Sequence, residues 1–166
     1  QAAADLLVKT GHVGRANNGL IAVWPHANTQ GAWEMGFTPA LDLAEVLQNA
    51  GVVYIAAADP AGDSEVLAQA LDKAGFVVVQ ELFLTETARH ADVVLPVQAP
   101  TEREGTYTSG ERRVQRFYPV VVPALPGPRA DYVISGQIGQ LLNVDLEAKA
   151  AALVMLRMAK THAAFV

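Results

Sequence analysis

Four short apolar runs, each bounded by glycine, proline or polar residues, constrain the fold of this chain more than any other feature of its sequence. They cover Leu20–Trp24, Val52–Ala57, Phe76–Gln80 and Asp92–Pro96. Runs of this length and near-continuous apolar character are typical of strands buried on both faces. Helical patterns lie between consecutive runs, at Leu41–Asn49, Ser64–Lys73 and Thr85–His90. The alternation predicts an α/β fold with a three-layer parallel sheet, Rossmann-like or flavodoxin-like.

The chain changes character after Pro100. Polar, charged and β-branched residues fill the stretch TEREGTYTSGERRVQRF, and the Ser109-Gly110 pair predicts that it forms a hairpin-like excursion. A proline-rich connector, VVVPALPGPRA, follows it. Two C-terminal helices are then expected, over Asp131–Leu142 and Leu146–Lys160.

The expected organisation is one α/β domain over residues 1–143 and a C-terminal helical segment over residues 144–166. The opening residues Ala2–Lys9 predict a helix that ends at Gly11. Because the chain begins at Gln1, within a helical pattern, we expect it to be a fragment of a longer protein.

Composition excludes several classes of function. A net charge of −5 argues against a nucleic-acid partner, because such binding depends on clustered Lys and Arg. The apolar runs are too short to cross a bilayer, which takes about 20 residues, so direct membrane insertion is not expected. The chain has no cysteine, and therefore no thiolate to bind zinc or an iron–sulfur cluster.

Catalytic and metal-binding motifs are not found in the sequence. The four histidines show no HExxH pattern, no serine lies in a GxSxG turn, and neither GxxxxGK[ST] nor GxGxxG follows a strand. We therefore expect no catalytic residue and no metal ligand. Ligands of parallel sheets bind beyond the carboxyl ends of the strands. Function is thus expected at the turns His26–Gln30, Ala58–Asp63, Glu81–Glu86 and Pro96–Pro100.

Three segments resemble one known family. The stretch LFLTETARHADVVLPVQAPTEREGTYTSGERRVQR is similar to the signature of the molybdopterin oxidoreductase superfamily, TETAxxADVVLP followed by ExxGTxxNxExRxQ. Upstream, TGHVGRANNG and HANTQGAWEMGF resemble the family's TGNVGRxGxG and NxQGAxDMG. The segment YIAAADP lies where the family has a strand that ends in GxNP.

Departures from the family pattern favour a branch that has lost the cofactor. Alanine at 57 or 58 and Asp59 replace the glycine and asparagine of GxNP, and Ser109 replaces an asparagine. A methyl group obstructs approach to a phosphate, and a carboxylate repels it. The segment between AWEMGF and VVYIAAADP is also short. The resemblance is then closest to the large iron–sulfur subunit of bacterial respiratory complex I, the NADH:quinone oxidoreductase.

That assignment implies a scaffold or docking domain without a cofactor-binding residue of its own. The enzyme would be a proton-translocating oxidoreductase that passes electrons from NADH to quinone through 4Fe-4S and 2Fe-2S clusters held outside these residues. Its partners would be other hydrophilic-arm subunits, including the flavin-containing NADH-binding subunit, at the cytoplasmic side of the bacterial inner membrane. Residues Arg112–Arg116 and Trp24–Trp33 are the expected docking surfaces, since Arg and Trp are enriched at interfaces.

The alternative is an active molybdenum or tungsten oxidoreductase such as a formate dehydrogenase. This chain would then help to hold a molybdopterin guanine dinucleotide. The resemblance implies that the residues lining the dinucleotide would be Asp59, Glu86, Thr87, Asp92, Gly105 and Thr106. A free-standing flavodoxin-like binding module is a third reading of the strand and helix pattern, although it leaves the signature unexplained.

Overall fold

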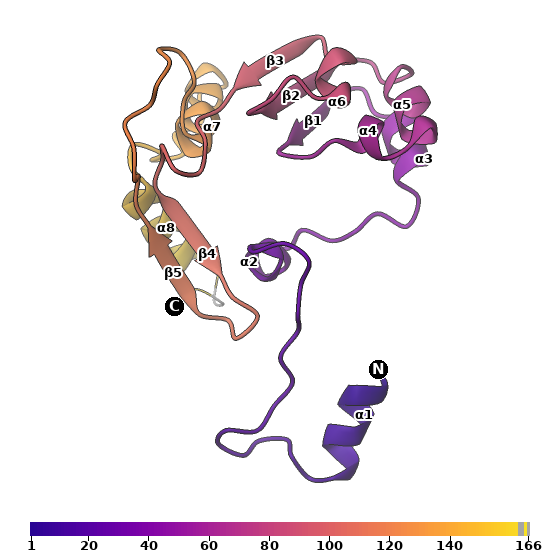
Figure 1. The fold of residues 1–166 in the computed structure, drawn as a ribbon, viewed down its shortest axis with the longest axis vertical. Coiled ribbons are helices and arrows are strands. Elements are labelled where there is room, and N and C mark those ends of the chain that lie inside the picture. Colours follow the sequence, from indigo (N-terminus) through magenta and orange to yellow (C-terminus); the bar gives the residue numbers. More distant parts are fainter. Residues whose placement is uncertain (163–164, 166) are drawn as a thin grey trace. The chain divides into compact units, whose positions relative to one another are not determined.

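The structure, a computed structural model, describes residues 1–162 and 165 and divides into two compact units (Figure 1). The hairpin unit contains Gln1–Phe37 and Thr106–Gln115. The sheet unit contains Thr38–Gly105 and Arg116–Val166. Residues 163, 164 and 166, at the end of the expected segment 144–166, lie outside the described residues.

A parallel sheet forms the centre of the sheet unit (Figure 1). Its strands are β1 (Val53–Ala56), β2 (Val77–Glu81) and β3 (Val93–Pro96), paired in the order β1-β2-β3. Val53 of β1 lies opposite Val77, and Val78 of β2 lies opposite Val93. These are the last three of the predicted strands, so the predicted α/β fold with a parallel sheet is confirmed.

Helices precede, connect and follow these strands. They are α3 (Leu43–Gln48), α4 (Pro60–Asp63), α5 (Glu65–Leu71), α6 (Glu86–Arg89), α7 (Asp131–Leu141) and α8 (Ala151–Thr161). Side-chain caps mark the starts of α3 and α6, where Asp42 accepts from the Glu45 amide and Thr85 accepts from the Ala88 amide.

The last helix begins later than the sequence pattern predicts, at Ala151 instead of Leu146. The Asp145 carboxylate accepts a hydrogen bond of 2.8 Å from the Glu147 amide, and Glu147 has a left-handed φ of 53°. A local turn of this kind competes with the first turn of a helix. The predicted start at Leu146 is therefore wrong, and the helix begins more than one turn later.

The core of the sheet unit lies between the sheet and its helices. Leu71 of α5 and Val79 of β2 are 1% and 0% exposed. Successive side chains of a strand point to opposite faces, so Gln80 lies on the other side of β2 from Val79. There its side-chain amide donates to Asp131 at the start of α7, at 2.6 Å.

The hairpin unit contains α1 (Ala2–Lys9), α2 (Thr29–Glu34) and the outer part of a two-stranded hairpin. The hairpin strands are β4 (Gly105–Thr108) and β5 (Val114–Phe117), whose turn includes the predicted Ser109-Gly110 pair. Helix α1 has the predicted bounds, and Gly11 follows it with a left-handed φ of 69°.

The predicted strand at Leu20–Trp24 is wrong. Its residues form no strand, and within residues 1–162 no other segment pairs with it. Val23 is 94% exposed, so this run is not buried as its apolar character predicted. An apolar run becomes a strand only where a second backbone supplies hydrogen-bond partners.

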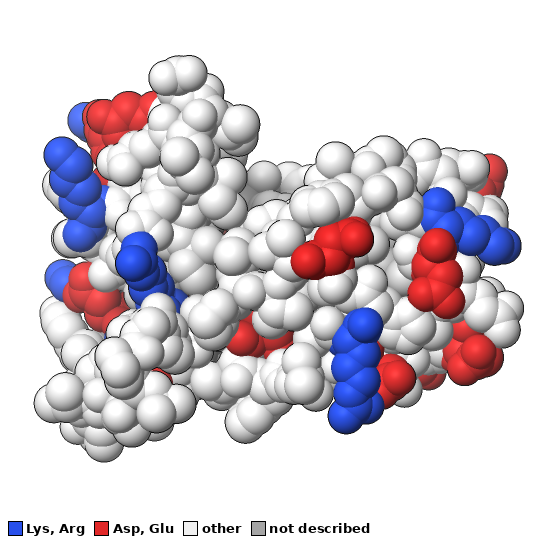
Figure 2. Space-filling view, turned by 90° about the horizontal axis from the view of Figure 1, so that it is seen from above, with Lys and Arg blue, Asp and Glu red and all other residues white. Residues whose placement is uncertain are grey.

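Charged side chains lie interspersed on the face of the molecule shown in Figure 2, with blue and red atoms near one another. Within the described part of the chain, no helix is both long enough and apolar enough to cross a bilayer.

The buried position of Leu71 gives a stability prediction. The substitution Leu71→Ala should lower the free energy of unfolding by about 3 kcal/mol, because it leaves a cavity beside Val77 and Val79. Leu141→Ala is the matched control, since Leu141 is also helical but 84% exposed, and should change it by less than about 0.5 kcal/mol. Chemical denaturation of both variants measures the difference, and equal losses would contradict this description of the core.

Candidate functional site

The segments that follow β1 and β2 are joined by Asp59 and Thr87. Oδ1 of Asp59 accepts hydrogen bonds from the Thr87 amide at 2.8 Å and from the Gly62 amide at 3.3 Å. Thr87 is fully buried, and its Oγ1 accepts from the Ala61 amide at 2.9 Å. Each side chain thus satisfies backbone donors of the other segment. We call this reciprocal pair the Asp59–Thr87 clasp.

The clasp uses the amide donors at the amino ends of α4 and α6. Asp59 also caps α4, whose first residue is Pro60, and in α6 the Ala88 amide donates to Thr85. A Cβ on Gly62 would lie 2.3 Å from Asp59 Oδ2, so the carboxylate occupies space that only glycine leaves open. These helix ends therefore find their acceptors inside the protein.

Hydrogen bonding lowers the pKa of the Asp59 carboxyl group. The main contribution comes from the Thr87 amide, followed by the Thr87 hydroxyl. Donors aimed at a carboxylate stabilise its charged form. Asp59 is therefore an anion at neutral pH and remains one further into the acid range than an ordinary aspartate.

The other residues that the family resemblance implies for the dinucleotide site make contacts separate from those of the clasp. Glu86 adjoins the clasp at the start of α6, but its side chain pairs with Arg89. The Asp92 carboxylate accepts from the Val77 amide at 2.7 Å, at the amino ends of β2 and β3. The structure thus brings Asp59, Glu86 and Thr87 together and places Asp92 where the strands begin.

Gly105 and Thr106 belong to the hairpin, where Gly105 begins β4. A Cβ on Gly105 would lie 2.7 Å from the ring of Phe117 on the opposite strand, so this glycine makes room for the aromatic ring. Thr106 lies in the same strand, within the hairpin unit. Neither residue makes a contact with the Asp59–Thr87 clasp among those the structure records.

Glu104 connects the base of the hairpin to the two last helices. Its carboxylate accepts from Arg116 at 2.6 Å, from the Ala151 amide at 3.1 Å and from the Tyr132 hydroxyl at 3.4 Å. The hydrogen bond from Arg116 is the largest cause of a lowered Glu104 pKa. The neighbouring Glu102 accepts from the Ala99 and Ala124 amides.

A groove of about 470 Å³ lies within the hairpin unit, between residues 21–27 and the end of the hairpin. We call it the hairpin groove. Its polar lining comes from His26, Ser109, Glu111, Arg113 and Gln115, and Trp24 contributes an aromatic side chain. The volume is within the range of small-molecule sites, roughly 300–1,000 Å³.

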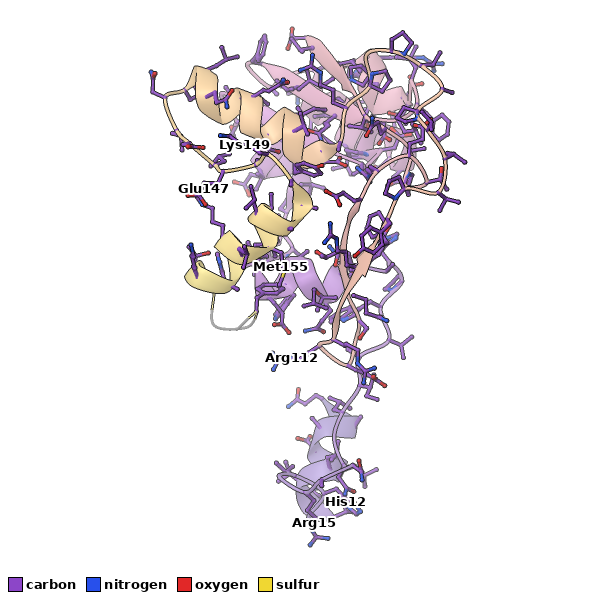
Figure 3. The ribbon with its side chains drawn as sticks, turned by 90° about the vertical axis from the view of Figure 1, so that its left-hand side faces the viewer. His12, Arg15, Arg112, Glu147, Lys149 and Met155 are labelled. Atoms are coloured by element: carbon purple, nitrogen blue, oxygen red, sulfur yellow. The ribbon has the colours of Figure 1, made fainter. Side chains whose placement is uncertain are left out.

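Partly buried polar contacts hold the hairpin groove. Asn28 Oδ1 accepts from the Thr108 amide at 2.9 Å, which ties the start of α2 to β4. The carboxylate of Glu34, only 3% exposed, pairs with Arg112 at 2.7 Å, and Arg112 lies at the end of the hairpin (Figure 3). Gln30 accepts from the Trp24 indole at 3.0 Å. These contacts leave Arg113, unlike Arg112, to face the groove.

Comparison with known proteins identifies the family. The profile of the family described as molybdopterin oxidoreductase matches residues 1–140. The chain belongs to the molybdopterin oxidoreductase family. Its similarity to the F420-dependent formate dehydrogenase 2 subunit alpha of Methanococcus maripaludis is 34% identity, over 68% of this chain and 22% of that protein.

Two further relatives of this molybdopterin oxidoreductase domain cover more of it. The F420-dependent formate dehydrogenase subunit alpha of Methanocaldococcus jannaschii is 31% identical over 86% of this chain and 26% of its own length. The putative formate dehydrogenase YrhE of Bacillus subtilis is 29% identical over 87% of this chain and 18% of its own length. The chain thus spans between about a fifth and a quarter of these relatives.

The expected assignment to respiratory complex I is wrong. It rested on the altered GxNP turn and the short preceding segment, whereas the similar proteins are named as formate dehydrogenases. The substitutions at this turn have a structural explanation instead, because Asp59 serves the clasp. The docking partners expected at Arg112–Arg116 and Trp24–Trp33 are untested by these observations.

The family implies a molybdenum or tungsten pterin cofactor. The Asp59–Thr87 clasp and the hairpin groove differ in the hydrogen-bond donors that they offer to its phosphates. At the clasp, the amide donors are already bonded to Asp59 and Thr87. In the hairpin groove, within the described residues, the Arg113 guanidinium has no recorded side-chain partner. A guanidinium suits phosphate and carboxylate oxygens geometrically. The hairpin groove therefore offers a guanidinium to an anionic group, whereas the amides of the clasp are already bonded.

Sequence reasoning found this groove only in part. The sequence predicts a strand-end turn at His26–Gln30 and a docking surface at Arg112–Arg116. No sequence pattern indicates that residues so far apart share one groove, since the link depends on the Asn28–Thr108 and Glu34–Arg112 contacts.

Glu104 gives a prediction about acid stability. Its lowered pKa means that its charge stabilises the fold above the ordinary glutamate value of 4.5, and that this stabilisation is lost as the pH falls through the lower folded value. In Glu104→Gln, unfolding free energy should therefore fall less steeply below pH 4.5 than in the unchanged protein. Glu45→Gln, which changes an exposed glutamate of α3, is the control and should keep the original slope. Equal slopes in all three proteins would contradict the role of Glu104.

Proposed function

We propose that this chain is part of a molybdopterin-dependent formate dehydrogenase. The observation that carries the proposal is its similarity to three proteins named as formate dehydrogenases, two of them over more than four fifths of the chain. The matched family profile supports the same class of oxidoreductase. The reaction class is the oxidation of formate with transfer of two electrons.

The hairpin groove is the proposed place of contact with the cofactor. Arg113 would bind a phosphate or carboxylate oxygen, and His26 and Ser109 would donate further hydrogen bonds to it. The pterin-bound metal supplies two-electron redox chemistry when the group is present. This chain supplies binding and orientation.

The surroundings of Arg113 restrict what the groove accepts. Glu111 lines the same groove, and its carboxylate repels an anion that lies too near it. Trp24 offers a flat apolar surface whose orientation is fixed by the hydrogen bond from its indole to Gln30. The groove thus suits a ligand with a planar part and an anionic part, as a pterin with phosphate has.

The proposed function predicts the metal content and activity of the full-length protein purified from its natural source. Molybdenum or tungsten should be present at about one atom per chain, and the protein should reduce an artificial electron acceptor in a formate-dependent reaction. Elemental analysis and a dye-reduction assay make the two measurements. A protein without either metal and without formate oxidation would contradict the proposal.

The groove gives a separate prediction. In full-length protein, Arg113→Ala should weaken cofactor binding by about tenfold, the effect expected when one charged hydrogen bond of about 1.5 kcal/mol is lost. The pterin and metal content measured after gel filtration should fall as a result. Arg15→Ala is the control, because Arg15 is exposed in the hairpin unit and does not line the groove (Figure 3). Equal cofactor content in both variants would exclude Arg113 as a ligand-binding residue.

A further inference from the structure

We propose that the Asp59 carboxylate is the protein's own anion at the amino ends of α4 and α6, so that the turn after β1 positions these helices and does not contact the cofactor's phosphates. The proposal rests on the proposed function for the presence of a cofactor. It concerns the turn at which the family resemblance implies a dinucleotide contact.

The hydrogen-bond donors at this turn are already bonded to side chains of the protein. A phosphate at this turn would need free backbone amides, since these are the groups that bind anions at the start of a helix. The amides of Ala61, Gly62, Thr87 and Ala88 all donate to side chains of the protein. A phosphate could reach them only by displacing Asp59, Thr85 or Thr87.

Side chains of the protein fill the space at this turn. Thr87 is 0% exposed, so its side chain is closed to a ligand. Gly62 leaves room for a carboxylate, and Asp59 fills that room, because a Cβ on Gly62 would lie 2.8 Å from its Cγ. Ala57 has a left-handed φ of 52°, which strains any residue with a side chain. Its methyl group stands where a glycine would leave the backbone open.

The turn also carries a negative charge of its own. Asp59 is held as an anion by the Thr87 amide and hydroxyl, which lower the pKa of its carboxyl group. A second anion beside it would be repelled. Within the described residues no ion pair to Asp59 is recorded that would offset this repulsion.

The test compares Asp59→Asn with Asp63→Asn in the full-length protein. Asp63 lies in the same helix α4, is exposed and has no recorded side-chain partner among the described residues, so it controls for the loss of one charge. Asp59→Asn should lower the thermal midpoint by about 5 °C relative to the control. Pterin and metal per folded chain should be equal in the two variants. The proposal would be overturned if Asp59→Asn lost pterin severalfold while its thermal midpoint equalled that of Asp63→Asn.

A second measurement serves if Asp59→Asn does not fold. Carboxyl carbon NMR of the unchanged, aspartate-labelled protein should show that the pKa of Asp59 lies below the ordinary aspartate value of 3.8, as the hydrogen bonds of the clasp require. An Asp59 pKa equal to or above that ordinary value would contradict the clasp. Neither this titration nor the thermal midpoint needs a cofactor. A protein without molybdenum or tungsten would therefore refute the proposed function, while these two readouts would still test the clasp.

Discussion

Backbone amides at the ends of helices and strands need acceptors, and carboxylates supply many of them in the sheet unit. Asp59 bonds amides of α4 and α6, Asp92 bonds the first amide of β2, and Glu104 bonds the first amide of α8. A buried amide without an acceptor would cost about 1–3 kcal/mol. The acidic residues that attract attention in the sequence are therefore engaged in connecting elements, and among the described residues no three metal-binding side chains gather into a cluster.

The sheet unit follows from local sequence, and the groove does not. Apolar runs at 52–57, 76–80 and 92–96 predict β1, β2 and β3, and Thr85 marks the start of α6 by its cap. The run at 20–24 has the same composition and forms no strand, because pairing depends on a second backbone that composition does not reveal. The hairpin groove depends on contacts between residues about 80 positions apart, such as Asn28 and Thr108.

The family signature had two readings that sequence alone left open. The change from GxNP to the residues around Asp59 favours a domain without a cofactor, whereas the similar proteins are named as formate dehydrogenases. The clasp explains how both observations hold together. A turn can stop contacting phosphates when a carboxylate takes over its amides, while Arg113 and His26 line a groove elsewhere in the chain.

The central claim is that the cofactor lies against the hairpin groove and not against the Asp59–Thr87 clasp. An electron cryomicroscopy map of the full-length protein, purified from its natural source, tests it most directly. The account predicts pterin density within hydrogen-bond distance of Arg113 and a direct bond from the Thr87 amide to Asp59. Phosphate density bonded to the Thr87 or Gly62 amide, or a groove filled by protein side chains alone, would contradict it.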